Sequence, residues 1–479
     1  MAFEYEDFRL SKLQELRRLG IDGYGGRFDG TVPVGELTDR FDELQGDSVR
    51  AAGRIAALRG MGKASFMDLK ERTGKVQLLF QLDRLGEEHF HVCQQIEPGD
   101  LIGVEGQLSK TRTGEITVFV DRFEILSKAL LSPPEKWHGL RDQEKRARQR
   151  YVDLFTNDDV MARFLKRTEI VRAMRAFLHE RAYVEVETPI MQAVAGGGVA
   201  LPFITHHNAL ELDLYLRIAI ELHLKRLLVG GIEKVFEIGR IFRNEGISRE
   251  HSPEFTMLEL YEAYGDYETM MDLTQDLIVR LAGDVCGSLS LPYDGSQIDF
   301  APPWPRRRFW DLLQEHVDLR RGDEDAIRRK AEQLNTRGAQ TEHPDYLAYQ
   351  VFEKTVGERL VDPTFVIDFP RSISPLAKAR EDDPGLAERF ELYVGRMEVA
   401  PAYTELNDPQ EQEQRFLAQV GHEDEKERID TDFLRALAYG MPPAGGLGLG
   451  IDRLTMLLTD TTSIREVILF PLLRPEEGT

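Results

Sequence analysis

The segment Phe236–Tyr261, FEIGRIFRNEGISREHSPEFTMLELY, carries the strongest structural signal in this 479-residue chain. Its alternating apolar residues predict a strand that runs into the letters FRNE, then a polar loop, then a second strand that opens at Pro253. The predicted hairpin presents Arg243, whose guanidinium suits a phosphate or carboxylate, and Phe255, whose ring can stack on a purine. A nucleotide site is one interpretation. An ordinary hairpin with a surface ion pair is the other, and it is preferred for the segment taken alone.

A second segment, Gly445–Leu458 with the sequence GGLGLGIDRLTMLL, predicts a glycine-rich strand that enters an amphipathic helix at Ile451. Asp452 and Arg453 fall in the first turn of that helix. The segment has neither the lysine and hydroxyl residue of a Walker loop nor the GxGxxG spacing of a dinucleotide-binding turn. Its glycines alone are therefore weak support for a phosphate site.

Upstream of the hairpin, the sequence predicts a long helix followed by an edge-like strand. Asn157 can cap the helix, whose apolar residues fall on one face. The strand Tyr183–Thr188 alternates and is ended by Pro189. The apolar face of the helix consists of Phe164, Leu165, Ile170, Val171, Met174, Phe177 and Leu178.

The N-terminal part has a different texture. Between Phe8 and Leu19, leucines three residues apart predict a short helix with one apolar stripe, made of Leu10, Leu13, Leu16 and Leu19. From Ser48 to Ser127, short alternating stretches are separated by glycine-containing turns, which suits a small closed five-stranded barrel. The expected strands are Val49–Leu58, Ser65–Leu69, Lys75–Gln81, Leu101–Gln107 and Ile116–Val120.

These textures divide the chain into residues 1–127, a linker over 128–150, and a larger domain over 151–479 with a helical insertion at about 304–380. The linker contains Pro133 and Pro134 and then a basic run. That run is either a solvated helix face or a phosphate contact, and both interpretations stay open. Its members are Arg141, Lys145, Arg146, Arg148 and Arg150.

The composition limits the class of protein less than the motifs do. The chain contains 61 Lys and Arg residues and 83 Asp and Glu residues, which gives a net charge of -22. This negative charge argues at first against a nucleic-acid partner. Phosphate binding depends on local clusters, however, and an acidic protein can have a basic face. Cys93 and Cys286 have no spacing typical of a disulfide framework or zinc site and are expected to be packing residues. No apolar run approaches the ~20 residues of a membrane span, and the acidic start indicates a cytoplasmic protein.

Together, the three segments resemble the ordered motifs of class II aminoacyl-tRNA synthetases. Residues 164–189 resemble motif 1, the FRNE hairpin resembles motif 2, and GLGLGIDR resembles motif 3. The resemblance implies an α+β catalytic domain in which helices flank an antiparallel β-sheet, and a homodimer formed through motif 1. A five-stranded OB-fold barrel ahead of that domain is typical of subclass IIb, which contains the lysine, aspartate and asparagine enzymes.

In the barrel, three residues match the subclass IIb pattern for reading a tRNA anticodon. They are Arg59, Phe66 and Gln77, with Glu115 in the turn TGE as a weaker match. The resemblance implies that Phe66 stacks on a base while Arg59 and Gln77 bond its edge, the usual way to read unpaired RNA. The alternative for Phe66 is a buried residue of the barrel core.

Acidic residues favour lysine among the three amino acids. The segment RFELYVGRMEVAPAYTELND carries Glu391, Glu398 and Glu405, which from spacing alone are three unrelated surface carboxylates. The resemblance to lysyl-tRNA synthetases implies instead that Glu391 and Glu398 bind Mg2+ and that Glu405 pairs with the ammonium of L-lysine. An aspartate enzyme would need a cation at that place.

Other positions match the family one by one. By resemblance, Gly197 and Glu221 hold the α-amino group of lysine, Glu259 and Tyr261 form the far end of its pocket, and Arg243 contacts its carboxylate and the ATP α-phosphate. Arg243 and Arg453, the latter matching the γ-phosphate arginine, are expected to carry the catalysis, and no nucleophilic residue is expected. The ATP site is expected to contain Arg243, Glu245, His251, Phe255 and Arg453. The implied substrates are ATP, L-lysine and tRNA(Lys).

Two positions depart from the family pattern. Pro401 stands where many relatives have Asn, so an amide contact to lysine is missing. Glu250 stands where the bacterial pattern often has Arg, so a cation is absent or is supplied by Arg249. Two alternatives therefore stay open: an aspartyl or asparaginyl enzyme, which Glu405 and Glu259 disfavour, and a non-catalytic RNA-binding paralogue.

Overall fold

The structure is a computed structural model that describes residues 4–134, 140, 142–194, 196–197, 200–419 and 429–475. The chain forms two compact units, Met1–Arg141 and Asp142–Thr479. Arg141, a member of the predicted basic run, lies outside the described residues. Each unit has its own hydrophobic core, so each can position a site independently.

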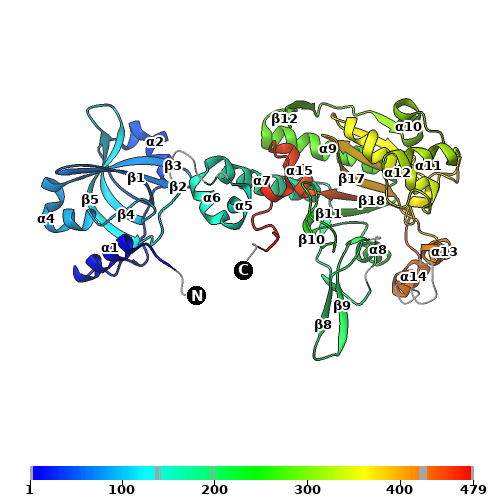
Figure 1. Ribbon diagram of the computed structural model, residues 1–479, viewed down its shortest axis with the longest axis horizontal. Coiled ribbons are helices and arrows are strands. Elements are labelled where there is room, and N and C mark those ends of the chain that lie inside the picture. Colours follow the sequence, from blue (N-terminus) through cyan, green and yellow to red (C-terminus); the bar gives the residue numbers. More distant parts are fainter. Residues whose placement is uncertain are drawn as a thin grey trace. The chain divides into compact units, whose positions relative to one another are not determined.

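The first unit contains a closed five-stranded barrel with the strand order β1-β2-β3-β5-β4, which confirms the predicted barrel (Figure 1). Alternation along β3 places Val76, Leu78 and Phe80 in the core of the barrel, while Lys75 before them and Gln77 between them are less buried. The sequence interpretation missed three helices of this unit, α2, α3 and α4, the last of which separates β3 from β4. The strands are β1 (Ser48–Met61), β2 (Ala64–Glu71), β3 (Gly74–Gln81), β4 (Leu101–Lys110) and β5 (Ile116–Ser127), and the helices are α1 (Asp7–Arg18), α2 (Val34–Asp39), α3 (Phe41–Leu44) and α4 (Leu82–Cys93).

The predicted leucine stripe of α1 is only half right. Leu13 and Leu16 are buried, but Leu19 is 42% exposed because the helix ends at Arg18. Arg9 is buried in its place and donates to the carbonyl oxygens of Pro98 and Ala129. Hydrogen bonds to backbone carbonyls let a buried guanidinium hold this helix.

The second unit is built on an eight-stranded sheet with the order β14-β15-β16-β17-β18-β11-β10-β6. The pairs β14–β15 and β10–β6 at the two edges are parallel and the central pairs are antiparallel, in line with the predicted antiparallel sheet. The strands are β6 (Val184–Glu185), β10 (Lys234–Phe242), β11 (Glu254–Ala263), β14 (Arg306–Arg308), β15 (Thr364–Ile367), β16 (Arg389–Val394), β17 (Met397–Thr404) and β18 (Ala444–Gly450).

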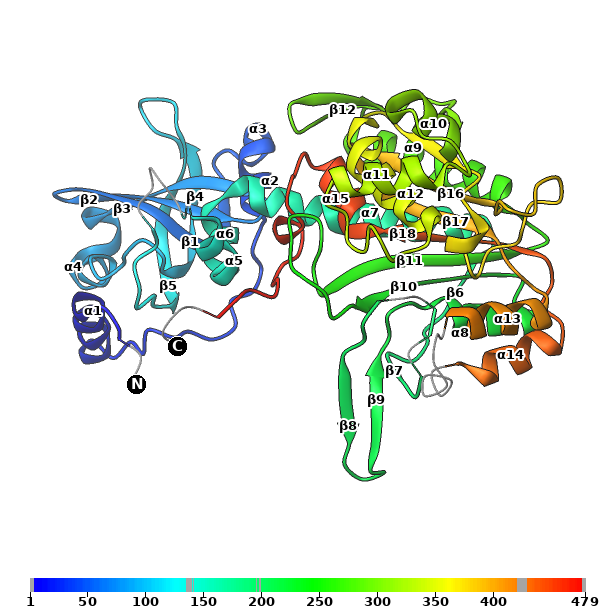
Figure 2. The same cartoon turned by 45° about the vertical axis from the view of Figure 1, so that its right-hand side comes forward.

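Helices cover the two faces of this sheet differently. The apolar core on one face joins the sheet to α7, α9 and α15, and on the other face α8 and α14 pack over β10 and β11 (Figure 2). A helical group of α10, α11 and α12 adds a further core. The helices are α5 (Gln143–Arg148), α6 (Arg150–Thr156), α7 (Asp158–Glu180), α8 (Glu221–Val229), α9 (Tyr267–Cys286), α10 (Phe309–Val317), α11 (Glu324–Gln333), α12 (Pro344–Thr355), α13 (Pro409–Gln419), α14 (Thr431–Ala438) and α15 (Ile451–Leu458).

Helix α7 and the short strand β6 correspond to the predicted motif 1. The helix begins after Asn157 as expected, but the Asn157 amide does not cap it and instead donates to Oδ1 of Asp153 at 2.6 Å. Leu165, assigned to the apolar face, is 38% exposed. The expected strand Tyr183–Thr188 is reduced to the two residues of β6, at the edge of the sheet. A very short edge strand leaves few unpaired backbone groups at the rim of the sheet.

A long hairpin leaves the sheet between motifs 1 and 2. Strands β8 (Ile204–His207) and β9 (Leu212–Leu216) form it, with β7 (Met191–Gln192) pairing at its base. Figures 1 and 2 both show this hairpin projecting away from the sheet. Ile204 near its base and Leu210 in its turn are 65% and 67% exposed.

The region 304–380 is largely helical, as expected, and it also contributes strands to the main sheet. Its beginning and end contribute β14 and β15 to the main sheet, and only α10–α12 form a group of their own. Short strands such as the three residues of β14 have too few positions to show a period. A small hairpin, β12 (Ser290–Tyr293) and β13 (Ser296–Asp299), precedes this region.

The two cysteines are packing residues, as predicted. Cys93 belongs to the buried core of the barrel, and Cys286 packs at the margin of the large core of the second unit. Burial raises the pKa of the Cys93 thiol to about 12, which keeps it protonated and unreactive.

Candidate active site

One face of the large sheet gathers the predicted site residues. Along β11, Leu258 and Leu260 point to the core under α9, so Glu259 and Tyr261 point to the opposite face. Glu259 lies opposite Gly448 of β18, and Tyr261 lies opposite Gly446. The glycine-rich strand therefore leaves room above itself for the large polar side chains of its neighbour.

The residues predicted to bind lysine converge above these glycines. Glu221, Glu259, Tyr261 and Glu405 are each no more than 6% exposed, and their electrostatic interactions join them into one group. Burial raises the pKa of Glu259 to about 7, and a hydrogen bond of 3.0 Å from the N–H of Ile220 opposes the rise. A cluster of buried carboxylates is the electrostatic complement of a cationic ligand.

Close packing explains two of the glycines. A Cβ at Gly446 would overlap Oε1 of Glu405 and the ring of Tyr261. Gly197 has a φ of +85°, and a Cβ there would stand 3.1 Å from the Cβ of Ala219 and 3.7 Å from that of Glu221. Gly197 and Glu221, both predicted to hold the α-amino group, are therefore neighbours.

The residues predicted for ATP form a second group. The guanidinium carbon of Arg243 lies 5.2 Å from the centre of the Phe255 ring, within cation–π range. Arg453, from the first turn of α15, donates to the carbonyl oxygen of Glu398 at 2.5 Å and lies 3.2 Å from Nε2 of His251. Glu245 is exposed in the loop after β10. The hairpin thus places Arg243 beside Phe255, and the first turn of α15 places Arg453 beside His251 of the hairpin loop.

The two carboxylates expected to bind Mg2+ lie on the same sheet face. Glu391 is two residues before Tyr393 on β16, and Tyr393 pairs with Glu398 of β17, so their side chains leave the same side. Burial raises the pKa of Glu391 to about 7, Arg389 opposes the rise, and Glu398 adds to it. Repulsion between two carboxylates of this kind is relieved by a cation.

The donor set fits Mg2+ bound with its substrate. Glu391 accepts from Arg389, from Tyr349 at 3.2 Å and from Tyr393 at 3.0 Å, which leaves it about one of its roughly four acceptor positions. Among the described residues no group of three or more His, Cys, Asp or Glu side chains is arranged for a metal. Two carboxylates are sufficient for Mg2+ when substrate phosphates and water complete its shell.

The structure locates both departures from the family pattern. Pro401 lies within β17 opposite Glu391, on the face that carries the site. Glu250 is exposed, and its N–H donates to Oγ of Ser248 at 3.2 Å. Arg249 next to it has no ion-pair partner among the described residues, so its guanidinium is available to an anion.

The residues predicted to read the anticodon lie together on the outer face of the barrel. Arg59 pairs with Phe66 across β1 and β2, and Asp68, two residues further, pairs with Gln77 of β3. Phe66 is half-buried and does not belong to the barrel core, so the core interpretation is wrong. Arg59 donates to Asp68 at 3.1 Å. Glu115 is exposed in the turn before β5.

Comparison with known proteins decides the family. Residues 142–474 match the family described as "tRNA synthetases class II (D, K and N)", and residues 49–126 match the "OB-fold nucleic acid binding domain". The chain belongs to the class II tRNA synthetases of this group. The predicted class II domain with an N-terminal OB-fold barrel is therefore confirmed.

Similar class II synthetases align over nearly their whole length. The chain is 50% identical over 477 residues to the lysine–tRNA ligase of Moorella thermoacetica, covering 98% of this chain and 97% of that protein. It is 51% identical over 480 residues to that of Pelotomaculum thermopropionicum, covering 98% and 94%. With that of Thermotoga maritima it shares 46% over 490 residues, covering 100% and 97%.

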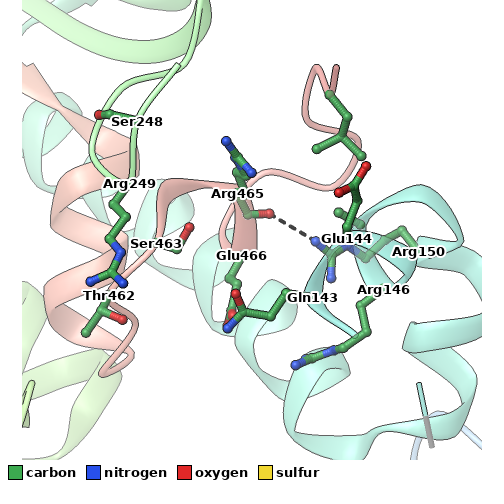
Figure 3. A pocket seen from close by; sticks show the side chains of 12 residues that line it. Gln143, Glu144, Arg146, Arg150, Ser248, Arg249, Thr462, Ser463, Arg465 and Glu466 are labelled. Atoms are coloured by element: carbon green, nitrogen blue, oxygen red, sulfur yellow. Dashed lines mark hydrogen bonds between the residues drawn. The ribbon is translucent and has the colours of Figure 1, made fainter. Parts of the chain in front are cut away.

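A cavity of about 350 Å3 in this synthetase lies beside the motif 2 loop. Figure 3 shows Arg249 of that loop on one side and Arg146 and Arg150 on the other, with residues 462–466 between them. Arg146 and Arg150 both pair with Asp153, at 2.9 and 2.5 Å, and Arg150 also donates to the carbonyl oxygen of Arg465. The prediction that the basic run is a solvated helix face is therefore wrong for Arg150, which is buried. Arg150 instead anchors the C-terminal segment.

Sequence analysis missed several residues of the synthetase site. Lys225 of α8 is fully buried between Glu221 and Glu405, and Tyr403 donates to Glu221 at 2.7 Å. Asp452 accepts from the N–H of Thr256 at 2.7 Å and so ties α15 to β11. The spacing of Glu221 and Lys225, four apart on a helix, was the available signal.

Across the described residues, no helix of the synthetase combines the length and the apolar character needed to cross a bilayer.

Proposed function

We propose that this chain attaches L-lysine to tRNA(Lys) with ATP, through a lysyl-adenylate. The observation that carries the proposal is the buried group of Glu221, Glu259 and Glu405, which suits an amino acid with two ammonium groups. An aspartate or asparagine enzyme would need a cation or an amide where Glu405 stands. The aligned relatives named lysine–tRNA ligase support the same substrate.

The chemistry follows in two transfers. A carboxylate oxygen of lysine attacks the α-phosphorus of ATP, the bond to the β-phosphate breaks, and pyrophosphate leaves. A hydroxyl of the terminal tRNA ribose then attacks the lysyl carbonyl carbon and AMP leaves. Arg243 orients the lysine carboxylate and the α-phosphate, and Arg453 neutralises the γ-phosphate, because phosphoryl transfer depends on placement and charge neutralisation.

Mg2+, when bound, neutralises charge on the ATP phosphates. Glu391 and Glu398 would hold it, since they share one face of the sheet and repel one another. His251, 3.2 Å from Arg453, and Phe255, stacked near Arg243, line the place for the nucleotide with Glu245. Gly197 and Glu221 bind the α-amino group, and Glu259, Tyr261 and Glu405 bind the side chain.

The barrel supplies the contact to the anticodon. Phe66 stacks on a base, Arg59 and Gln77 bond its edge, and Glu115 lies at the nearby turn. This role is supported by the common outer face of Arg59, Phe66 and Gln77. The proposed division is therefore a barrel domain over 1–127, a linker over 128–150 and a catalytic domain over 151–479.

A cytoplasmic homodimer is the proposed working form. Large apolar side chains stay exposed on and after motif 1: Leu165 at 38%, Val184 at 49% and Met191 at 56%. Apolar residues of this size are normally covered, and a second copy of the chain would cover them. Light scattering of the purified chain at micromolar concentration is expected to give twice the monomer mass, and a monomer mass would contradict the proposal.

Lysine-dependent exchange of labelled pyrophosphate into ATP tests the activity. Pyrophosphate exchange is expected in the presence of lysine. With aspartate or asparagine the exchange rate should stay at the background level. Absence of exchange with any amino acid, in a folded protein that still binds tRNA, would favour the non-catalytic alternative. Charging of tRNA(Lys), followed with labelled lysine, then tests the second transfer.

A further inference from the structure

Lys225 lies inside the proposed lysine pocket, where no cation was expected. It is 0% exposed, and its Nζ lies 2.6 Å from Oε1 of Glu221 and also pairs with Oε2 of Glu405. Tyr403 donates to the same Oε1 of Glu221 at 2.7 Å. Two acidic residues of the proposed substrate site are thus joined by one lysine of the chain itself.

Each of these carboxylates keeps a second oxygen for a ligand. Oε1 of Glu405 is buried and accepts no hydrogen bond from any described residue. The two donors to Glu221 both reach its Oε1, so its Oε2 has no donor within the described part of the chain, but this oxygen is not among the fully buried ones. A buried carboxylate oxygen without a donor is costly, so it points to a donor that arrives with a ligand.

Opposing effects act on the pKa of Lys225. Burial lowers the pKa of Lys225, but Glu221 and Glu405 raise it, and the net direction is upward, so the ammonium stays charged. Burial raises the pKa of Glu405, and Lys225 is the group that opposes the rise, while Glu221 and Glu259 add to it. Tyr261 and Tyr403 face the same carboxylates, and Arg217 and Arg243 reach Glu259.

We infer that Lys225 is a resident counterion that sets the charge of the lysine pocket and so helps to determine substrate specificity. It holds one oxygen of Glu221 and one of Glu405 and leaves their other oxygens for the two ammonium groups of the substrate. When Glu221, Glu259 and Glu405 are all ionised, their three negative charges and the one positive charge of Lys225 leave two negative charges, which the two ammonium groups of lysine match. The inference rests on the proposed lysine site.

The counterion role predicts a defect that depends on charge. In Lys225→Met, which keeps the length and removes the ammonium, Glu405 loses the cation that opposes its protonation. Substrate lysine must then displace a proton, so its KM is expected to rise about 10- to 100-fold at about pH 7 and to recover partly as the pH rises. The KM for ATP and the kcat are expected to change less than about threefold.

Calorimetry measures the proton directly. At about pH 8, where Glu259 is largely ionised, lysine binding to Lys225→Met is expected to release more protons than binding to the wild type. The number comes from binding heats in buffers of different ionisation enthalpy. An unchanged proton number, or tighter binding of lysine because Lys225 had competed with it, overturns the inference. An equal loss for lysine and ATP also overturns it, because that is the result of a general structural defect.

A matched control lies in the barrel unit. Lys128 is also 0% exposed and pairs with the buried Asp100 at 2.6 Å. Lys128→Met is expected to lower the thermal stability and leave the KM for lysine unchanged. A rise in the lysine KM in this variant equal to that in Lys225→Met would overturn the inference, since any lost buried lysine would then have the same effect.

Two further variants separate the possible failures. If Glu405→Gln and Lys225→Met both leave lysine activation intact, the proposed lysine site is wrong; if only Lys225→Met does so, the site stands and the counterion role is wrong. If Lys225→Met does not fold, Lys225→Arg replaces it. The arginine keeps the charge, so no additional proton should be released, and an additional proton from this variant overturns the inference.

Discussion

Replacing Phe66 by Ala tests whether the outer face of the barrel reads RNA. Phe66 is half-buried, lies opposite Arg59 and does not belong to the barrel core. One stacked base contributes ~1 to 3 kcal/mol, so Phe66→Ala should raise the Kd for tRNA(Lys) by roughly 5- to 150-fold. Lysine-dependent pyrophosphate exchange without tRNA should be unchanged, because it needs only the catalytic unit.

Phe80→Ala is the matched control for this substitution. Phe80 is 0% exposed inside the same barrel, and its ring meets that of Phe123 at 5.3 Å. Its truncation should cost ~3 to 5 kcal/mol of stability, whereas truncation of the half-buried Phe66 should cost well under half of that. Fluorescence anisotropy with labelled tRNA gives the Kd, and thermal unfolding gives the stability. If Phe66→Ala destabilises the barrel as much as Phe80→Ala, or leaves tRNA affinity unchanged, the stacking role is refuted.

Four further predictions concern the catalytic unit. Glu405→Gln should lower kcat/KM for lysine by roughly two to four orders of magnitude, with little change for ATP, because the ammonium of the substrate lysine loses its buried partner. If pyrophosphate exchange falls only a few-fold, Glu405 does not belong to the lysine pocket. Gly446→Ala should reduce lysine activation by on the order of 100-fold, since its Cβ meets Glu405, whereas Gly283→Ala in α9, with open space around it, should keep full activity. Because the pKa of Glu259 is raised to about 7, its carboxylate ionises between about pH 6 and pH 8, and the KM for lysine should fall over that range. In Glu259→Gln this pH dependence of the KM should disappear. If the pH dependence persists in Glu259→Gln, another group is responsible for it. Pro401→Asn should tighten lysine binding or leave it unchanged, and a large loss of affinity measured by calorimetry would mean that this part of β17 is built around the proline.

Local patterns in the sequence determine the parts of the fold that repeat over short distances. The hairpin of β10 and β11 and the passage from β18 into α15 begin and end within a few residues of their predicted bounds. These segments are predictable because the alternation of a strand and the period of a helix are properties of neighbouring residues. The same patterns fail for β14 and for β6, which are too short to show a period.

Long-range packing decides which side chains meet. The sequence by itself indicated Glu221, Glu259 and Glu405 as binding residues, by resemblance, and indicated Phe66 with its core alternative still open. Only the tertiary structure places Lys225 between Glu221 and Glu405, which are 184 positions apart along the chain (405 minus 221), and puts Phe66 on the outside of its barrel. The physical reason is that burial and ion pairing depend on distances in space, which are set when α8 packs over β11 and β17 pairs with β18.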